Sequence, residues 1–191
     1  MKIIVLLFII IYIFYNYYIK LKLSNQILIK SNFDNNFYLV NKCNKNKMYS
    51  SYLLSIIRYK LIYLTEKIKI TKENKIYIEN IKKKIYQTQF IENKNIFPKK
   101  KITSYSVNKG EKIVLCLYDY KKQTFFDLNI LIFVSIHELA HIANPTIGHD
   151  ESFYYIFNIL LNYAIQFKIY KFFDYQNIPK KYCGILINSN I

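Results

Sequence analysis

All three histidines of this 191-residue chain lie within 13 consecutive residues, in the string HELAHIANPTIGH. His137 and His141 are four residues apart, and Glu138 directly follows the first of them. On a helix such a spacing places both imidazoles on one face, with the carboxylate beside them. Zinc hydrolases use imidazole ligands and a nearby carboxylate to activate a water molecule. The pattern therefore predicts Zn²⁺ bound by His137, His141 and His149, with Glu138 as general base.

The residues before the first histidine predict a buried helix. The string LNILIFVSIHELAHIA is apolar on nearly every side, and Asp127 directly before it can cap its first turn. The helix should end near Ala143, because Asn144-Pro145 breaks it. Buried in such a helix, the two histidines and the glutamate would need partners, and a metal ion provides them.

The residues after the break predict a turn and a second helix. Gly148 permits the backbone reversal that returns His149 to the metal, and Asp150 lies in the first turn of the next helix, where an acidic side chain interacts with the positive helix end. The apolar stripe of this helix has the spacing of one face: Phe153, Ile156, Phe157, Leu160, Leu161 and Ala164. His149 is on the same inward face, so it can serve as the third ligand.

Upstream segments predict supporting helices and a hairpin. Two amphipathic patterns are helical, the first with Leu53, Leu54, Ile57, Leu61 and Leu64 and the second with Ile78, Ile81 and Ile85. After Pro98, residues 103–107 and 113–118 are β-prone, and the cluster at 108–111 between them contains Gly110. These features predict an antiparallel hairpin ahead of the metal helix.

The amino-terminal segment predicts a membrane anchor. Residues 3–19 carry no charge, and 17 residues in a helix rise about 26 Å, close to the ~30 Å of a bilayer core. A cleavable signal is the disfavoured alternative, because no Ala or Gly precedes Gly110. Three lysines, Lys20, Lys22 and Lys30, follow the apolar segment, and Lys2 alone precedes it. Because positive charge favours the cytoplasmic side of a membrane, this bias predicts that the catalytic part is cytoplasmic. The predicted divisions are an anchor at 1–23, an Asn- and Lys-rich stalk or lead-in at 24–48, and one domain at 49–191.

The composition bears on partners and on redox state. The net charge of +16 is typical of proteins that bind nucleic acid or an anionic membrane, but 27 of the 28 basic residues are Lys and only Arg58 is suited to bidentate phosphate contacts. Nucleic acid is therefore an alternative partner that is not favoured. Three cysteines, at 43, 116 and 183, are too few and too widely spaced for a disulfide framework. They are predicted to be core-filling thiols in a reducing compartment.

The motif and its flanks resemble a known family. HELAH followed by GHxxxF is similar to the zincin metallopeptidases of the WLM and SprT-like group, above all the small members encoded by large nucleocytoplasmic DNA viruses. The strings VNKGEKIVLCLYDY, FFDLNILIFVSIHELAH and PKKYCG carry this resemblance over residues 103–187. The resemblance implies an α+β fold: a minimal zincin-like domain of helices, a small antiparallel sheet or hairpin, and a two-helix HExxH…H metal site. An edge strand at 113–118 would bind extended substrate through Ile113, Val114 and Leu115. Tyr182, in the string YCG, is the candidate oxyanion donor.

These observations predict a membrane-anchored, zinc-dependent metallopeptidase. A metal-activated water would attack the peptide bond of a peptide or protein substrate, and Glu138 would accept its proton. The localisation would be single-pass in a membrane, of the host or the virion if the chain is viral. Two alternatives stay open. One is a protease of SprT-like or WLM type that acts on DNA-bound proteins, and the other is a non-catalytic membrane protein in which zinc only joins two helices.

Overall fold

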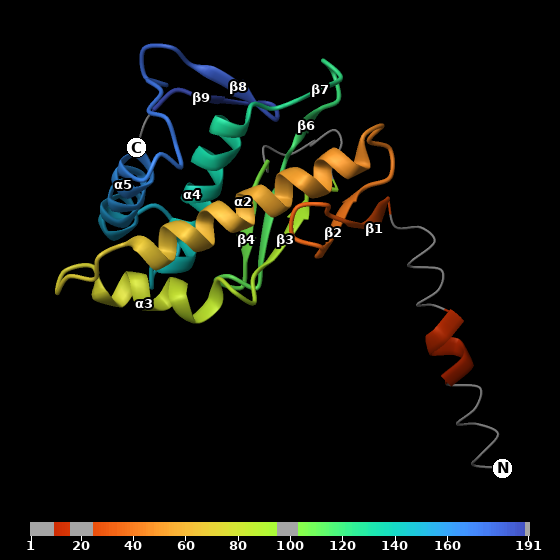
Figure 1. Ribbon diagram of the computed structural model, residues 1–191, viewed down its shortest axis with the longest axis horizontal. Helices are drawn as coiled ribbons and strands as arrows, with labels where there is room; N and C mark the ends of the chain where they lie inside the picture. Colours follow the sequence, from red (N-terminus) through yellow and green to blue (C-terminus); the bar gives the residue numbers. More distant parts are fainter. Residues whose placement is uncertain (1–9, 16–24, 95–102, 190–191) are drawn as a thin grey trace.

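The computed structural model describes residues 10–15, 25–94 and 103–189, and it combines helices with a mixed sheet (Figure 1). The strands are β1 (Gln26–Lys30), β2 (Phe37–Asn41), β3 (Gln89–Glu92), β4 (Tyr105–Val107), β5 (Lys112–Leu115), β6 (Tyr118–Asp119), β7 (Thr124–Phe125), β8 (Lys180–Tyr182) and β9 (Ile185–Ile187). The helices that carry the core are α2 (Lys47–Lys67), α3 (Lys75–Lys84), α4 (Leu128–Ala143) and α5 (Glu151–Gln166). The α+β class expected from the sequence describes this arrangement.

The main sheet has five strands in the order β1-β2-β3-β5-β4. β1 pairs with β2 and β4 pairs with β5 antiparallel, whereas β2, β3 and β5 run parallel to one another. β4 is therefore an edge strand of the described sheet, and β5 has a neighbour on each side. The predicted hairpin is present as β4–β5, and Gly110 in its turn has a φ of +112°.

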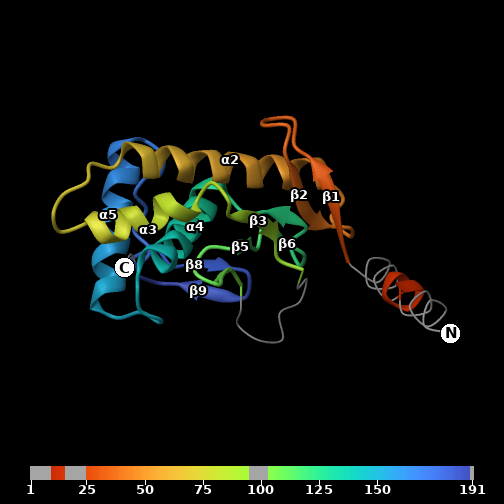
Figure 2. The ribbon, with the colours of Figure 1, turned by 90° about the horizontal axis from the view of Figure 1, so that it is seen from below.

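The helices form a layer on one face of this sheet. α2 packs on β1, β2 and β3, α4 packs on β4 and β5, and α2 and α4 also contact each other. In Figures 1 and 2 the long helix α2 runs across the whole helical layer, and α3 and α5 lie next to α4. α4 is thus surrounded by helices and by the sheet, which explains why nearly all of its residues are apolar.

The four helices follow the sequence patterns closely. α4 covers the predicted string, and the Asp127 carboxylate accepts a hydrogen bond from the backbone N–H of Asn129 at 2.9 Å. The stripe predicted for α5 is the buried face of that helix, and the apolar positions predicted for α2 and α3 are fully buried. Amphipathic spacing and a capping residue were sufficient to predict these elements.

The lead-in segment and the cysteines differ from the predictions. Residues 24–48 contain β1 and β2, which belong to the main sheet, although no strand was predicted there. Both strands are short and apolar in the middle, QILIK and FYLVN, without a polar–apolar alternation that would mark them as strands. Cys116 and Cys183 form a disulfide across a separation of 67 residues, whereas free thiols were predicted. The sequence could not show that the end of β5 meets the β8–β9 turn.

The predicted membrane-spanning helix is contradicted. Within the described residues of the chain, every helix falls short of the length and apolarity that crossing a bilayer requires. In the predicted anchor at 1–23, residues 10–15 are helical, and the remainder lies outside the described residues. The apolar composition of a segment shows that it can enter lipid, but not that it forms a continuous helix of the required length. The same finding contradicts the predicted single-pass membrane localisation.

Candidate metal centre

The three histidines converge as the sequence predicts. The Nε2 atom of His149 lies 3.1 Å from the Nε2 atom of His137 and 3.1 Å from that of His141. His137 and His141 are half-buried on one face of α4, and His149 is exposed just before α5. Among the described residues, these three side chains form the one group of histidines, cysteines and acidic residues close enough to share a metal ion.

The ring of one phenylalanine packs against all three imidazoles. Phe153, in the first turn of α5, is fully buried, and its ring centroid lies 4.9 Å from that of His137, 4.5 Å from that of His141 and 4.6 Å from that of His149. Packing against one rigid side chain limits the rotamers of all three ligands. The site is therefore held in place by the core as well as by the backbone.

The loop between α4 and α5 is held by Asp150, the N-cap of α5. Its carboxylate accepts hydrogen bonds from the Phe153 backbone N–H at 2.9 Å, the Ser152 hydroxyl at 2.8 Å and the Asn144 side-chain amide at 3.0 Å. The Thr146 hydroxyl also donates to it, and together these bonds hold the pKa of Asp150 well below its usual range. Asp150 is thus the N-cap of α5, one position before the first turn in which it was predicted to lie, and it fixes the loop that presents His149.

A second group of contacts fixes the same loop from the β4–β5 turn. The Lys109 ammonium donates to the backbone carbonyls of Asn144, at 2.8 Å, and of Thr146. Gly110 allows this close approach, because a Cβ atom there would lie 3.0 Å from the Ile142 side chain. Gly148 has a φ of +99°, which provides the predicted reversal. The sequence analysis missed Lys109, because no local pattern relates the hairpin to the end of α4.

Glu138 follows His137 on α4 and is buried. It is 4% exposed, and burial raises its pKa to about 8, although a backbone hydrogen bond from Ser106 of β4 opposes this rise. Its side chain lines a cavity of about 440 Å³ that His137 and His149 also line. A cation held by the histidines would favour the ionised carboxylate, which is the form able to accept a proton.

The donor set fits zinc. Ligand nitrogens at ~2.0–2.1 Å from a tetrahedral zinc ion lie ~3.3 Å apart. The His149 nitrogen is 3.1 Å from each of the other two, and all three candidate ligand atoms lie within 4.8 Å of one another. Burial, with a smaller effect of neighbouring charges, lowers the pKa of His137 to about 3 and that of His141 to about 4. Both imidazoles are therefore neutral at pH 7, as metal ligands must be. Three histidines also leave one tetrahedral position for water or substrate.

The predicted substrate strand is not where the sequence analysis placed it. Ile113, Val114 and Leu115 form most of β5, which is buried between β3 and β4. Their backbone groups pair with those two strands, so they cannot also bind an extended substrate. The edge strand beside α4 is β4. A turn signal predicts that two strands form a hairpin, but it does not show which of them is the outer one.

Tyr182 reaches the cavity, but its hydroxyl is engaged. It donates a hydrogen bond to the Cys116 carbonyl at 2.9 Å and lies 2.7 Å from the Ser104 hydroxyl. The Cys116 backbone N–H in turn donates to the Ser104 hydroxyl at 3.2 Å, which closes a ring of hydrogen bonds. A phenol has a single proton to donate, so this geometry gives no support to the predicted oxyanion role.

Comparison with known proteins places these features in a family. Residues 75–178 match the WLM domain, a range that includes all three histidines and Glu138. The chain is 37% identical over 172 residues to protein R325 of Acanthamoeba polyphaga mimivirus, covering 88% of this chain and 85% of that protein. It is 34% identical over 99 residues to protein 136R of Invertebrate iridescent virus 6, covering 49% and 54%.

A solved structure is also similar. The crystal structure of Wss1 from Saccharomyces cerevisiae is 22% identical, with a TM-score of 0.49, and the match covers 68% of this chain and 88% of that one. The family match and the identity to R325 confirm the resemblance stated from the HELAH motif and its flanks, including the similarity to proteins of large DNA viruses. This chain belongs to the WLM domain family, a group of zincin-type metallopeptidases.

Proposed function

We propose that this protein is a zinc-dependent peptidase. The observation that carries the proposal is the convergence of three imidazole nitrogens beside a buried carboxyl group that faces a cavity. His137, His141 and His149 would hold the ion. Zinc bound there would polarise a substrate carbonyl and make a water molecule acidic enough to react at neutral pH.

The chain's own residues would carry the proton transfers. Glu138 would accept the proton of the attacking water and return it to the leaving amine, so that one buried group serves both steps. Its burial excludes bulk water that would compete for the proton. Phe153, Asp150 and Lys109 position the ligands and take no part in proton transfer.

The substrate backbone would bind along β4. This strand is an edge of the described sheet, it packs on α4, and its Ser106 backbone bonds to Glu138. An extended peptide added at this edge would pair with β4 groups other than the Ser106 N–H, which already donates to Glu138, and would place its carbonyls next to the general base. Hydrogen bonds between backbones depend little on the side chains, so this mode of binding would give low sequence specificity.

Substitution of Glu138 tests the proposal. Full-length Glu138→Gln should retain about one zinc per chain, measured by elemental analysis, and should lose cleavage of denatured protein by about 10²–10⁴-fold. Glu92→Gln is the matched control, because Glu92 is equally buried but lies outside the cavity. It should cleave within about twofold of the original protein. Zinc-loaded protein that cleaves no peptide, or Glu138→Gln with undiminished activity, would contradict a catalytic role and favour a structural zinc.

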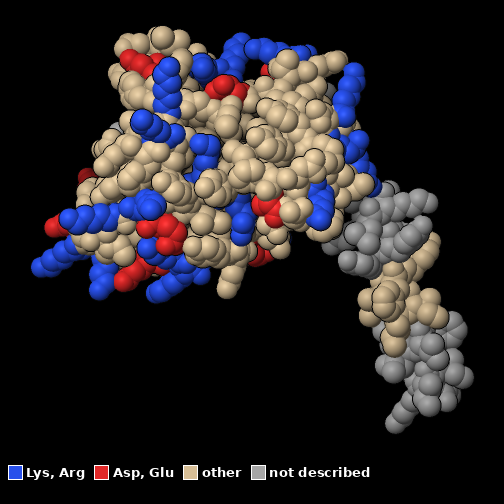
Figure 3. Space-filling view, in the orientation of Figure 1, with Lys and Arg blue, Asp and Glu red and all other residues tan. Residues whose placement is uncertain are grey.

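A second candidate makes DNA-bound proteins the substrates. The net charge of +16 favours it, and lysine side chains project over the end of α3 among a few acidic ones (Figure 3). Cleavage of a DNA-binding protein should then be stimulated by duplex DNA, and the stimulation should fall by roughly tenfold or more between 50 and 200 mM salt. Cleavage that duplex DNA does not change would exclude this candidate without affecting the peptidase proposal.

A further inference from the structure

The cavity beside Glu138 extends well beyond the metal ligands. Its volume of about 440 Å³ exceeds what one water molecule and a carbonyl group need. It is bounded by α4, α5, the β8–β9 hairpin and residues 103–104, and its apolar lining consists of Phe133, Val134, Phe153, Phe157, Ile185, Leu186 and Ile187, with the rings of Tyr154 and Tyr182. We call this apolar part of the cavity the apolar subsite.

The subsite lies directly next to the reacting groups. Phe133 precedes His137 by four residues on α4, and Val134 precedes Glu138 by four, so each lies one turn back on the same helix face. The cavity therefore extends from the metal centre toward the beginning of α4, away from the loop that carries His149. A peptide whose carbonyl reaches Glu138 would place a side chain next to the cleaved bond over this space.

The lining selects against charge. The chain has 27 lysines, yet none of them, and no arginine or aspartate, is among the described residues that line the cavity. Glu138 is the charged group there, and it is needed for proton transfer. The other polar groups of the lining are uncharged side chains: Thr103, Ser104, Asn188 and Ser189, with His137 and His149 at the metal end. They can donate or accept hydrogen bonds but cannot neutralise a charge, so a charged substrate side chain would lose much of its hydration, whereas a large apolar one would gain from burial.

The hairpin wall is held in place. Cys183 and Gly184 form its two-residue turn with φ values of 47° and 85°, as a type I′ turn requires. Tyr182 bonds to the Cys116 carbonyl, and the disulfide joins Cys183 to Cys116 at the end of β5. Because the hairpin is already ordered, little conformational entropy is lost when a substrate side chain binds against it. The hairpin can therefore distinguish substrate side chains by their shape.

We propose that the apolar subsite binds one large apolar side chain, of Phe, Tyr, Leu or Met, on the substrate residue next to the cleaved bond. Ile187 of β9 is the specificity-determining residue on the hairpin wall. This inference rests on the proposed peptidase function and names the substrates that the site prefers. Specificity then comes from the hairpin cavity, while pairing along β4 provides sequence-independent binding.

Cleavage profiling tests the preference. Zinc-loaded full-length protein is incubated with a mixture of denatured proteins, and mass spectrometry identifies the residues that flank each cleaved bond. Large apolar residues should be enriched roughly tenfold over Ser and Gly at one fixed flanking position, and Asp, Glu, Lys and Arg should be depleted there. Cleavage without apolar enrichment at either flanking position would overturn the subsite and leave the peptidase proposal standing.

A charge placed in the wall should change the preference. Ile187→Lys adds an ammonium group to the half-buried wall, so it should reduce cleavage next to apolar residues about tenfold and increase cleavage next to Asp or Glu. Ile178→Lys is the matched control, because Ile178 is 60% exposed and lies outside the cavity lining. It should keep the original profile. An unchanged profile in a folded, zinc-loaded Ile187→Lys protein would show that the wall does not contact substrate.

Binding separates this proposal from the catalytic one. Zinc-loaded Glu138→Gln is titrated with two fluorescein-labelled Gly-Ala-Ser peptides that differ only in a central Phe or Ser. Fluorescence polarisation should show roughly tenfold tighter binding of the Phe peptide, and Ile187→Lys in the same background should abolish the difference. Preferential binding by Glu138→Gln, together with no cleavage of any peptide by the original zinc-loaded protein, would support the subsite and contradict the peptidase function. Equal binding of both peptides would overturn the subsite.

Discussion

Two glutamates of this chain are almost equally buried but have different surroundings. Glu92, at the end of β3, is 1% exposed and accepts hydrogen bonds from the Asn41 backbone N–H at 2.9 Å and the Asn44 side chain at 3.4 Å. Glu138 is 4% exposed, and it faces a cavity that two histidines also line. Burial raises the pKa of both carboxyl groups. What distinguishes the candidate base is therefore open space and convergent ligands beside it, and not burial alone.

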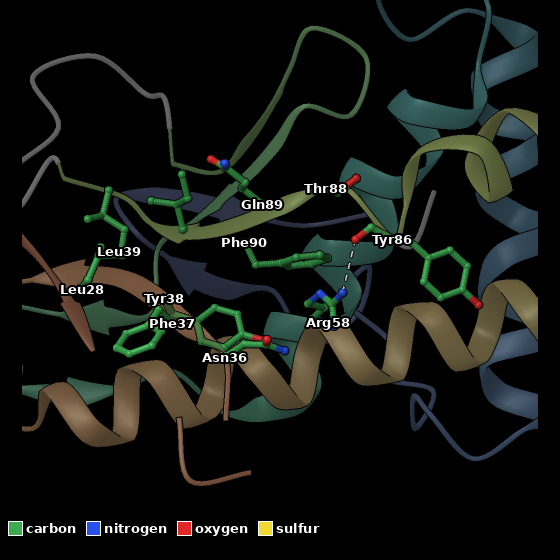
Figure 4. A pocket seen from close by; sticks show the side chains of 11 residues that line it. Leu28, Asn36, Phe37, Tyr38, Leu39, Arg58, Tyr86, Thr88, Gln89 and Phe90 are labelled. Carbon is green, nitrogen blue, oxygen red and sulfur yellow. Dashed lines mark hydrogen bonds between the residues drawn. The ribbon is translucent and has the colours of Figure 1, made fainter. Parts of the chain in front are cut away.

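Two cavities of the molecule repeat this contrast. A cavity of about 380 Å³ lies where β2 and β3 diverge, since these strands pair only at Leu39 and Ile91 (Figure 4). Its one charged side chain, Arg58, donates to the Tyr86 carbonyl at 3.3 Å and so ties α2 to the connection before β3. The cavity at α4 instead combines metal ligands, a base and apolar walls. The two cavities have similar volumes. The charged side chain of the first joins two structural elements, whereas the second is a candidate reaction site.

Among substitutions outside the ligands and Glu138, the largest effect should follow from releasing the loop that carries His149. Asp150→Ala removes the acceptor of four hydrogen-bond donors, so His149 would no longer be held toward α4. We expect zinc affinity to fall about 10–100-fold, measured by competition with a chelator of known affinity.

Asp34→Ala is the matched control for that loop. Asp34 likewise accepts local hydrogen bonds, from Asn36 and from the Tyr38 hydroxyl, but it lies beside β2. Its removal should lower stability without changing zinc affinity. Equal zinc affinity in folded Asp150→Ala and in the original protein would show that α4 alone determines the site.

Local patterns were sufficient to predict that the three histidines converge. Asp127 before an apolar run, Asn144-Pro145 after it and the stripe beginning at Phe153 each act within a few residues, so α4, α5 and the convergence of the histidines follow from the sequence. Each of these signals reports on backbone geometry within one or two turns of a helix.

The parts that sequence reasoning missed depend on contacts between distant residues. The parallel pairing of β2 with β3 joins residues about 50 apart, and the Cys116–Cys183 disulfide joins residues 67 apart. Lys109 reaches the end of α4 from another element. The β8–β9 wall of the cavity likewise comes from the far end of the described chain. No local periodicity encodes such contacts, so the sheet order, the edge strand and the subsite required the structure.

The smallest effect concerns the pH dependence of stability, and it tests the structural role of Glu92. Burial raises the pKa of Glu92 above its ordinary value of 4.5, against the effect of its hydrogen bonds. An acid whose pKa is raised on folding stabilises the fold below its unfolded pKa, and this contribution is lost as the pH rises through the folded pKa. The free energy of unfolding of the original protein, minus that of Glu92→Gln, should therefore fall as the pH rises above about 4.5. Its slope cannot exceed about 1.4 kcal/mol per pH unit, because one proton is involved.

Asp34→Asn should give the opposite slope. Burial acts to raise the pKa of Asp34, but hydrogen bonds from Tyr38 and Asn36 outweigh it, and the pKa is lowered from 3.8. The corresponding difference should thus grow as the pH rises toward 3.8 and then level off. Both differences can be measured by urea unfolding, and any contribution of bound metal, which the two proteins of each pair share, cancels in the difference. If the difference in the free energy of unfolding between the original protein and Glu92→Gln does not change between pH 4 and 8, the hydrogen bonds to Glu92 fully offset the effect of its burial on its pKa. Glu92 and Glu138 would then differ in hydrogen bonding as well as in position.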